Sequence, residues 1–144
     1  MDITTVRQLL QIKGQDVWSI TPRATVFEAL RMMADKDVGA MLVTENDNLV
    51  GILSERDYAR KVILKGKASK NIQVKDIMTR VLFTVHPDQT IEECMELMTN
   101  QRIRHIPVVL DDEILGVISI GDVVKDIIFQ QRQTIKNLER YVTG

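Results

Sequence analysis

A pattern of hydrophobic and polar positions runs through this chain twice, with the second copy sixty-five residues after the first. In the first copy, Thr25 and Glu28 have the spacing of a capping box, which predicts that a helix begins there. The apolar residues that follow at helical spacing are Val26, Ala29, Leu30 and Met33. Residues at these steps lie on one face of a helix, so the pattern predicts a single buried stripe.

Two strands and a second helix are predicted after that stripe. The nearly continuous apolar run 38–43 indicates a strand covered on both faces. A polar turn at 46–48 leads to a second strand over Gly51–Ser54. Ser54 then stands where a helix cap belongs, and the helix is predicted to continue to about Leu64.

The second half of the chain repeats these signals without a gap. The matching pairs are Pro22 and Pro87, Thr25 and Thr90, Glu28 and Glu93, Met33 and Met98, Val43 and Val108, Asp47 and Asp112, Gly51 and Gly116, Ser54 and Ser119, and Asp57 and Asp122. Repetition in register of the caps, turns and apolar stripes indicates an internal duplication.

Short lead-in segments come before each copy. Residues 3–12 predict an amphipathic helix that ends at Gly14, and residues 17–20 predict a brief strand. The polar, basic stretch 65–73 is interpreted as a linker, and residues 74–78 as a helical turn that mirrors the first lead-in.

The duplication predicts an α/β (α+β) fold made of two pseudo-symmetric repeats, each a small three-stranded sheet with two helices. Each half is too small to bury both faces of its sheet, so the halves are expected to pack together and to leave a cleft between them. The predicted boundaries are 1–73 for the first repeat with its lead-in helix, 74–129 for the second repeat, and 130–144 for a C-terminal helical extension.

The chemistry of the repeat is concentrated in its Ser-x-x-Asp sequence. A serine and a carboxylate at the start of a helix suit an anion and the hydroxyls of a ribose, because the backbone N–H groups there are unpaired and the carboxylate only accepts. The same tetrad is also close to a capping box, in which the acid only binds its own helix. For Ser54 with Asp57 and for Ser119 with Asp122, both interpretations stay open.

Composition and charge argue against several classes of function. A net charge of −1 gives no general attraction to nucleic acid or to a membrane surface, and no apolar run is long enough to span a bilayer, so we expect a cytoplasmic protein. Cys94 is the only cysteine, which excludes an internal disulfide, and its place in the second apolar stripe favours a buried structural thiol over a nucleophile. With two histidines and no metal-ligand spacing, we predict no catalytic and no metal-binding residues.

Taken together, two copies of a strand, a threonine-capped helix, a strand and hydrophobic-Gly-hydrophobic-hydrophobic-Ser-x-x-Asp resemble the tandem CBS-domain pair, or Bateman module. The turn 74–79 and the run Arg104-His105-Ile106-Pro107-Val108-Val109 also resemble that family. The similarity covers residues 3–129. It implies a regulatory module that requires no cofactor and binds an adenine nucleotide, AMP, ADP, ATP or NAD, in the cleft between the repeats.

The resemblance also implies roles for individual residues. Asp57 and Asp122 are expected to bind the ribose hydroxyls. The expected phosphate-binding residues are Ser54, Arg56, Thr79, Arg104, His105 and Ser119. The expected adenine-lining residues are Trp18, Ser19, Ile20, Met41, Thr84, Val85 and Ile106.

Structural alternatives accompany several of these roles. His105 is also consistent with a core imidazole bonded to backbone, and Trp18 with ordinary core or interface packing. The cations are unequal between the copies, since Arg56 matches Gly121 while Arg104 and His105 match Gly39 and Ala40. We therefore expect two non-equivalent sites.

The tail beyond the repeat carries a heptad-like stripe. Its members, with Gln131 in the gap, are Val124, Ile128, Ile135, Leu138 and Val142. Such a stripe is typical of helix pairing, and CBS pairs commonly dimerise, so we expect a homodimer to which the tail contributes. Docking of the tail on its own domain is the alternative.

Three functions remain. The favoured one is a non-catalytic sensor that changes conformation with nucleotide and acts on an unidentified effector protein. A dimerisation or interaction module without ligand is the alternative, and a nucleotide-processing enzyme is favoured least because no catalytic set is present.

Overall fold

In the computed structural model, which describes residues 4–14, 16–81 and 83–143, the chain divides into two compact units. The first-repeat unit comprises Val17–Leu82. The second-repeat unit comprises Phe83–Gly144 together with the N-terminal segment Met1–Asp16. Each unit contains one copy of the repeat, and the mixed α/β fold class predicted from the sequence is confirmed.

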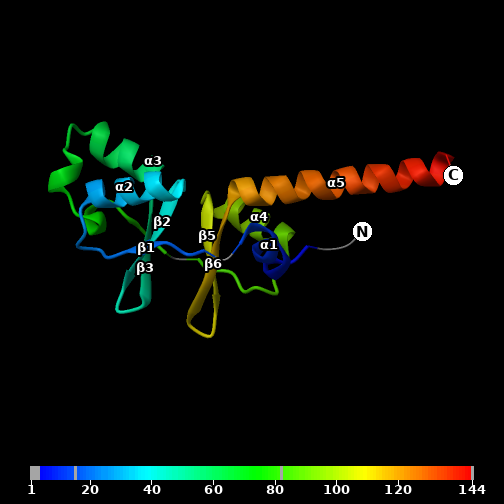
Figure 1. The fold of residues 1–144 in the computed structure, drawn as a ribbon, viewed down its shortest axis with the longest axis horizontal. Helices are drawn as coiled ribbons and strands as arrows, with labels where there is room; N and C mark the ends of the chain where they lie inside the picture. Colours follow the sequence, from blue (N-terminus) through cyan, green and yellow to red (C-terminus); the bar gives the residue numbers. More distant parts are fainter. Residues whose placement is uncertain (1–3, 15, 82, 144) are drawn as a thin grey trace. The chain divides into compact units, whose positions relative to one another are not determined.

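The first-repeat unit is built on a four-stranded sheet in the order β1-β2-β3-β4 (Figure 1). Its strands are β1 (Ser19–Ile20), β2 (Ala40–Glu45), β3 (Asn48–Ser54) and β4 (Thr79–Arg80). Its helices and turns are α2 (Val26–Lys36), α3 (Glu55–Tyr58), a π-helical turn over Ala59–Ile63, and 3₁₀ turns over Ser69–Asn71 and Val74–Asp76. Strand β1 pairs with β2 in parallel, and the other neighbours are antiparallel.

The second-repeat unit contains α1 (Val6–Lys13), α4 (Ile91–Gln101), β5 (His105–Leu110), β6 (Glu113–Ser119) and α5 (Ile120–Thr143). Strands β5 and β6 form an antiparallel pair, and one parallel bridge joins Val85 to Val108. This bridge lies sixty-five residues after the pairing of Ile20 with Val43. The prediction of three strands per repeat therefore differs from the structure, which adds the short β4 to one unit and reduces the third strand to a single bridge in the other.

Each unit has a tight hairpin that follows from its turn residues. Asn46 and Asp47 connect β2 to β3 with φ values of 52° and 65°, and Asp111 and Asp112 connect β5 to β6 with φ values of 50° and 64°. Two consecutive residues with positive φ make a type I′ turn, whose twist matches that of the paired strands. Asn and Asp tolerate this conformation better than other residues with a side chain.

Capping threonines begin the helices at the predicted positions. The Thr25 hydroxyl accepts a hydrogen bond from the Glu28 N–H at 3.1 Å, and Thr90 accepts one from Glu93 at the same distance. The structure thus has the threonine half of the predicted capping box at each helix. A full box, with both reciprocal bonds, is present instead at Thr5, which begins α1.

Each lead-in segment packs on the repeat that it does not directly precede, which differs from the predicted boundaries. The Val6 N–H donates to the Gln89 carbonyl at 2.8 Å, so α1 is attached to the second repeat. The matching bond in the first-repeat unit runs from the Val74 N–H to the Ala24 carbonyl, also at 2.8 Å. Further pairs of the same kind join Arg7 to Pro87 at 2.8 Å and Lys75 to Pro22 at 2.9 Å. Each compact unit therefore combines one repeat with the lead-in that precedes the other repeat.

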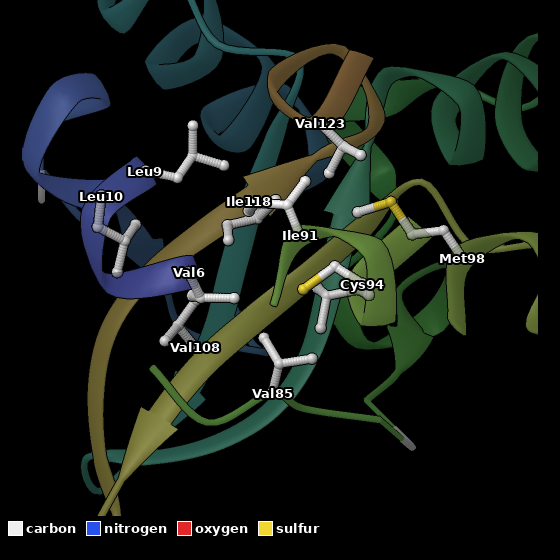
Figure 2. Close-up of a cluster of buried hydrophobic side chains, with 11 residues drawn as sticks. Val6, Leu9, Leu10, Val85, Ile91, Cys94, Met98, Val108, Ile118 and Val123 are labelled. Atoms are coloured by element: carbon white, nitrogen blue, oxygen red, sulfur yellow. The ribbon is translucent and has the colours of Figure 1, made fainter. Parts of the chain in front are cut away.

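Both lead-ins complete a hydrophobic core. Figure 2 shows Val6, Leu9 and Leu10 of α1 pointing toward side chains of α4, of the β5–β6 pair and of the start of α5. The remaining members of this core are Val85, Ile91, Cys94, Met98, Ile106, Val108, Ile118 and Val123. In the first-repeat unit, Val74 and Ile77 close the corresponding core around α2 and the β2–β3 hairpin.

Helix α5 begins in the core of the second-repeat unit and continues beyond it. Val123 is fully buried, whereas Ile135 and Leu138 are 54% and 60% exposed. Figure 1 shows the C-terminal half of α5 extending past α1 and α4, the helices of its own unit. Helix α5 continues without a break from the Ser119–Asp122 turn into the tail, where the sequence predicted a helical extension. None of the helices described is both long enough and apolar enough to cross a membrane.

Candidate functional site

The Ser54–Asp57 pair forms the start of α3 in the first-repeat unit. The Asp57 N–H donates to Ser54 Oγ at 3.1 Å, while Asp57 Oδ2 accepts from both the N–H and the hydroxyl of Ser54 at 3.0 Å. This reciprocal arrangement is a full capping box. It holds the carboxylate in one orientation beside the first turn of the helix.

The other carboxylate oxygen of Asp57, Oδ1, contacts a residue of β4 and a lysine of the π-helical turn. Thr79 Oγ1 donates to Asp57 Oδ1 at 3.1 Å, and Lys61 Nζ lies 3.3 Å from the same oxygen. Lys61 Nζ also donates to the Ile77 carbonyl at 2.8 Å. The ammonium group therefore links the π-helical turn, the carboxylate and the lead-in turn of this unit.

The Ser119–Asp122 pair repeats the cap at the start of α5. The Ser119 N–H donates to Asp122 Oδ2 at 2.8 Å, and the Asp122 N–H donates to Ser119 Oγ at 3.1 Å. Here the cation comes from helix α1, since Lys13 Nζ lies 2.5 Å from Asp122 Oδ2 and 2.6 Å from the Val117 carbonyl. The lysine thus connects the last turn of α1 to strand β6 and to the carboxylate.

These contacts change the proton affinity of Asp122. Burial by itself would raise the pKa of this carboxyl, but the hydrogen bonds from Lys13 and Ser119 and the charge of Lys13 together hold its pKa below the usual value of 3.8. The side chain is 19% exposed, so the carboxylate remains within reach of solvent. Asp122 is therefore ionised at neutral pH and accessible as an acceptor.

The two lysines come from different elements of the fold. The position in the second repeat that matches Lys61 is Asp126, which cannot supply a cation. In the lead-in segments Val6 matches Val74, so the position that matches Lys13 is Val81. Each carboxylate thus pairs with a lysine that has no counterpart in the other copy of the repeat.

The ion pair between Lys13 and Asp122 should make the stability of the second-repeat unit depend on pH, and a substitution of Lys13 tests this. Lys13→Met should lower the free energy of unfolding of the second-repeat unit by roughly 1 kcal/mol at neutral pH. Because the folded-state pKa of Asp122 is depressed, the contribution is present above the unfolded pKa and is lost as the pH falls through the folded one. Urea unfolding at about pH 7 and about pH 3 compares the full contribution with the reduced one.

Lys75→Met is the matched control, since Lys75 is an exposed lysine in the other lead-in segment. It should change stability little at either pH. A difference between wild type and Lys13→Met that stayed constant down to the lower pH would contradict the assignment of the ion pair.

The structure gathers the predicted phosphate-binding residues into two separate groups. Ser54, Arg56 and Thr79 lie around Asp57 in the first-repeat unit, with Arg56 exposed and Thr79 bonded to the carboxylate. Ser119, Arg104 and His105 lie around Asp122 in the second-repeat unit. Their proximity is shown by the strand pairing of His105 with Ser119 and by the Ile120 N–H, which donates to the Arg104 carbonyl at 2.9 Å.

The predicted adenine-lining residues differ in burial. Ser19 and Thr84 are exposed, and Ile20 is half-buried at the edge strand β1. Trp18 is half-buried, and Lys36 Nζ lies 4.3 Å from the centre of its ring, a cation–π distance. The side chains of Met41, Val85 and Ile106 are enclosed in the cores of their own units, with at most 2% exposure, which is the burial expected of packing residues.

Two features of the described residues concern metal binding and thiol reactivity. The described residues contain no group of three or more His, Cys, Asp or Glu side chains that could hold a metal ion. Burial, with a smaller effect from Glu93, raises the pKa of the Cys94 thiol to about 11, so the thiol is protonated at neutral pH. The expectation that Cys94 is structural agrees with this burial.

Sequence reasoning missed the lysines of the site. It gave Lys61 no role, although the i,i+4 spacing from Asp57 is a signal that could have identified the pair. No local pattern pointed to Lys13, which meets Asp122 across 109 residues of sequence. The shared cleft between the repeats and the ligand roles of the residues above stay predictions.

Comparison with known proteins gives consistent results. A family model of the CBS domain matches the chain twice, at residues 6–64 and 74–128. The protein from Arabidopsis thaliana described as "CBS domain-containing protein CBSX3, mitochondrial" is 40% identical over an alignment that covers 98% of this chain and 73% of that protein.

Solved structures show the same likeness. The crystal structure of a CBS domain, NE2398, is 48% identical with a TM-score of 0.83, covering 88% of this chain and 99% of that one. The CBS domain pair of protein MJ0100 shares the fold with a TM-score of 0.79 at 22% identity, covering 90% of this chain and 99% of that one.

Proposed function

Since this chain belongs to the CBS-domain family and carries two copies of the domain, we propose that it is a non-catalytic regulatory module that binds an adenine nucleotide. The observation that carries the proposal is the pair of carboxylates, Asp57 and Asp122, each fixed by a cap and each beside further donors. The MJ0100 domain pair, which has the same fold, was crystallised in complex with 5′-methylthioadenosine and S-adenosyl-L-methionine. AMP, ADP, ATP and NAD share the adenosine part of those molecules.

The chemistry of each group in the proposed site is complementary to such a ligand. A carboxylate only accepts hydrogen bonds, so it suits the two hydroxyls of a ribose. Arg56 and Arg104 supply the forked donors that suit phosphate, and Thr79 and Ser119 supply hydroxyls. An apolar slot with backbone groups is sufficient for adenine.

Regulation follows if the ligand favours one conformation of the module over another. A bound nucleotide shifts such an equilibrium only by its difference in affinity for the two conformations. The output is then a change in the surface offered to an effector protein. This role requires no bond-breaking step.

Thermal unfolding with AMP, ADP, ATP and NAD tests the proposal. A ligand present at 100 times its dissociation constant should raise the free energy of unfolding by about 2.7 kcal/mol. GMP and inorganic phosphate serve as matched controls for base and phosphate recognition. No stabilisation by any adenine nucleotide would favour a ligand-free interaction module instead, and turnover of the added nucleotide would favour an enzyme.

We also propose that the module is a homodimer and that the tail of α5 takes part in it. The exposed stripe runs from Val124, 42% exposed, to Val142, 81% exposed, at the steps of a heptad. Ile135, Leu138 and Val142 are exposed. This exposure argues against the alternative in which the tail docks on its own domain. A related CBS-CP12 protein from bloom-forming cyanobacteria is hexameric, so members of the family oligomerise.

Charged substitutions in the stripe should weaken this dimer. Ile135→Asp combined with Leu138→Asp introduces two carboxylates into the proposed apolar contact, and burial of unpaired charges is strongly unfavourable. Light scattering of the wild type should give a dimer and of the variant a larger monomer fraction. Lys136→Asp with Asn137→Asp is the control, because these exposed residues lie off the stripe. An unchanged dimer after removal of residues 130–144 would contradict the role of the tail.

A further inference from the structure

The tail of α5 leaves its own unit near Gln130. The Gln130 Nε2 donates to Thr4 Oγ1 at 3.0 Å, which ties this turn of the helix to the residues that lead into α1. Beyond it, Ile135, Leu138 and Val142 are each more than half exposed, and Figure 1 shows this part of the helix extending past α1 and α4. About three turns of helix therefore present an apolar stripe that another chain can cover.

The charged residues beside this stripe lie on one side of it. The stripe positions in this part of the helix are Gln131 and Leu138 at d, and Ile135 and Val142 at a. Arg132 and Glu139 each follow a d residue directly, so both stand at e positions. The g positions, on the other side of the stripe, hold the hydroxyl side chains of Thr134 and Tyr141. The two charges of opposite sign are thus seven residues apart on the same edge.

A parallel pair of tails would leave these charges without an opposite partner across the seam. In a parallel coiled coil an e residue lies beside a g residue of the other helix, so Glu139 would lie beside Thr134 and Arg132 beside Ile127. Each d residue would also face its own copy, which places two Gln131 amides against each other inside the seam. Parallel pairing therefore gains no ion pair and buries two amides.

An antiparallel pair of tails brings the same charges together. In this orientation a residues face d residues, and the e residues of the two helices lie beside each other. When Ile135 faces Leu138 of the other helix, Arg132 lies beside Glu139, and two-fold symmetry gives this ion pair twice. Gln131 then lies at the end of the overlap, where its amide stays in contact with water.

We infer that a second copy of this chain covers the tail, with the two α5 helices antiparallel over residues 131–142 and Arg132 of each beside Glu139 of the other. The inference rests on the proposed homodimer, to which it adds an orientation and a register. Helix α5 is 24 residues long and is anchored in the core by Val123, so the pairing does not have to nucleate the helix.

Charge reversal tests the pairing on the full chain. Arg132→Glu and Glu139→Arg each turn two attractions into repulsions, so either variant should raise the dissociation constant of the dimer about tenfold, measured by sedimentation at several concentrations. An equal mixture of the two variants should dimerise as the wild type does, because the acidic edge of one chain then faces the basic edge of the other. Arg140→Glu is the control, since this exposed residue lies at an f position, away from the seam.

Disulfide cross-linking tests the orientation directly. In the antiparallel pair, the two copies of residue 131 lie about 16 Å apart along the seam, too far for a disulfide, whereas residue 131 faces residue 142. Gln131→Cys alone should therefore stay uncross-linked under mild oxidation, and its mixture with Val142→Cys should give a covalent dimer. The native thiol of Cys94 is buried and does not interfere. A covalent dimer from Gln131→Cys alone would show a parallel pair and overturn the inference.

The outcomes distinguish this inference from the proposal on which it rests. A dimeric wild type whose dissociation constant is unchanged by Arg132→Glu and by Glu139→Arg would overturn the antiparallel pairing and leave the dimer in place. A wild type that stays monomeric would overturn the dimer itself. Circular dichroism of each variant checks that the helix is retained, so that a lost dimer is not mistaken for a lost fold.

Discussion

Replacing Leu10 by alanine is expected to lower the free energy of unfolding of the second-repeat unit by about 2–5 kcal/mol, the range for large-to-small changes in a core. Leu10 is 1% exposed, and its side chain lies in the core with α4 and the β5–β6 pair. Truncation removes apolar contact and leaves a cavity that the surrounding strands cannot fill. Hydrogen exchange of residues 83–129 should show the loss in the second repeat, seventy or more residues away in sequence.

Ile12→Ala is the control for this change. Ile12 is on the same helix but is 80% exposed, so its truncation should cost less than about 0.5 kcal/mol. A loss of protection confined to residues 17–81 in Leu10→Ala would mean that α1 belongs to the first repeat, as the boundaries predicted from sequence implied.

Substitution of Gly51 by alanine should destabilise the first-repeat unit by about 1–3 kcal/mol, as expected when a close-packed position is overfilled. A Cβ at Gly51 would lie 2.7 Å from Met78 Sδ and 3.0 Å from the Thr79 carbonyl oxygen. The methionine can rearrange, but the carbonyl belongs to β4, which is paired with β3 at this point. Denaturant unfolding measures the cost.

Gly116→Ala and Gly39→Ala provide graded controls. The three atoms nearest to a Cβ at Gly116 all belong to the Leu10 side chain, the first at 2.7 Å, so the cost should be smaller than at Gly51, where a backbone oxygen lies at 3.0 Å. Gly39 has no atom within 4 Å of the added Cβ, and its substitution should be nearly neutral. If all three variants were equally stable, the lead-in segments would not be packed on strands β3 and β6 as described.

Local signals account for most of what the sequence predicted correctly. The apolar stripe from Val26 to Met33, the capping threonines and the Asn-Asp and Asp-Asp turns each depend on neighbours within a few residues. The Ser-x-x-Asp pairs were also identified, together with the cap geometry that the structure shows for both. Duplication helped, because each weak signal appeared twice at the same spacing.

Long-range pairing could not be predicted in the same way. The sequence of α1 specifies one apolar face but contains no information about which repeat that face meets. Adjacency in the chain favoured the first repeat, whereas the bonds from Val6 and Arg7 place the helix on the second. The position of Lys13 beside Asp122 is a consequence of that placement and was hidden for the same reason.

The exchange of lead-in segments has a consequence for the order in which the polypeptide folds during its synthesis. The first-repeat unit is contiguous, so all of its parts have been translated once the ribosome has passed residue 82. Helix α1 is made before the first repeat, whereas its partners α4, β5 and β6 are made after it. Since domains fold as units while the chain grows, the apolar face of α1 has no partner from its own unit until the second repeat has been synthesised.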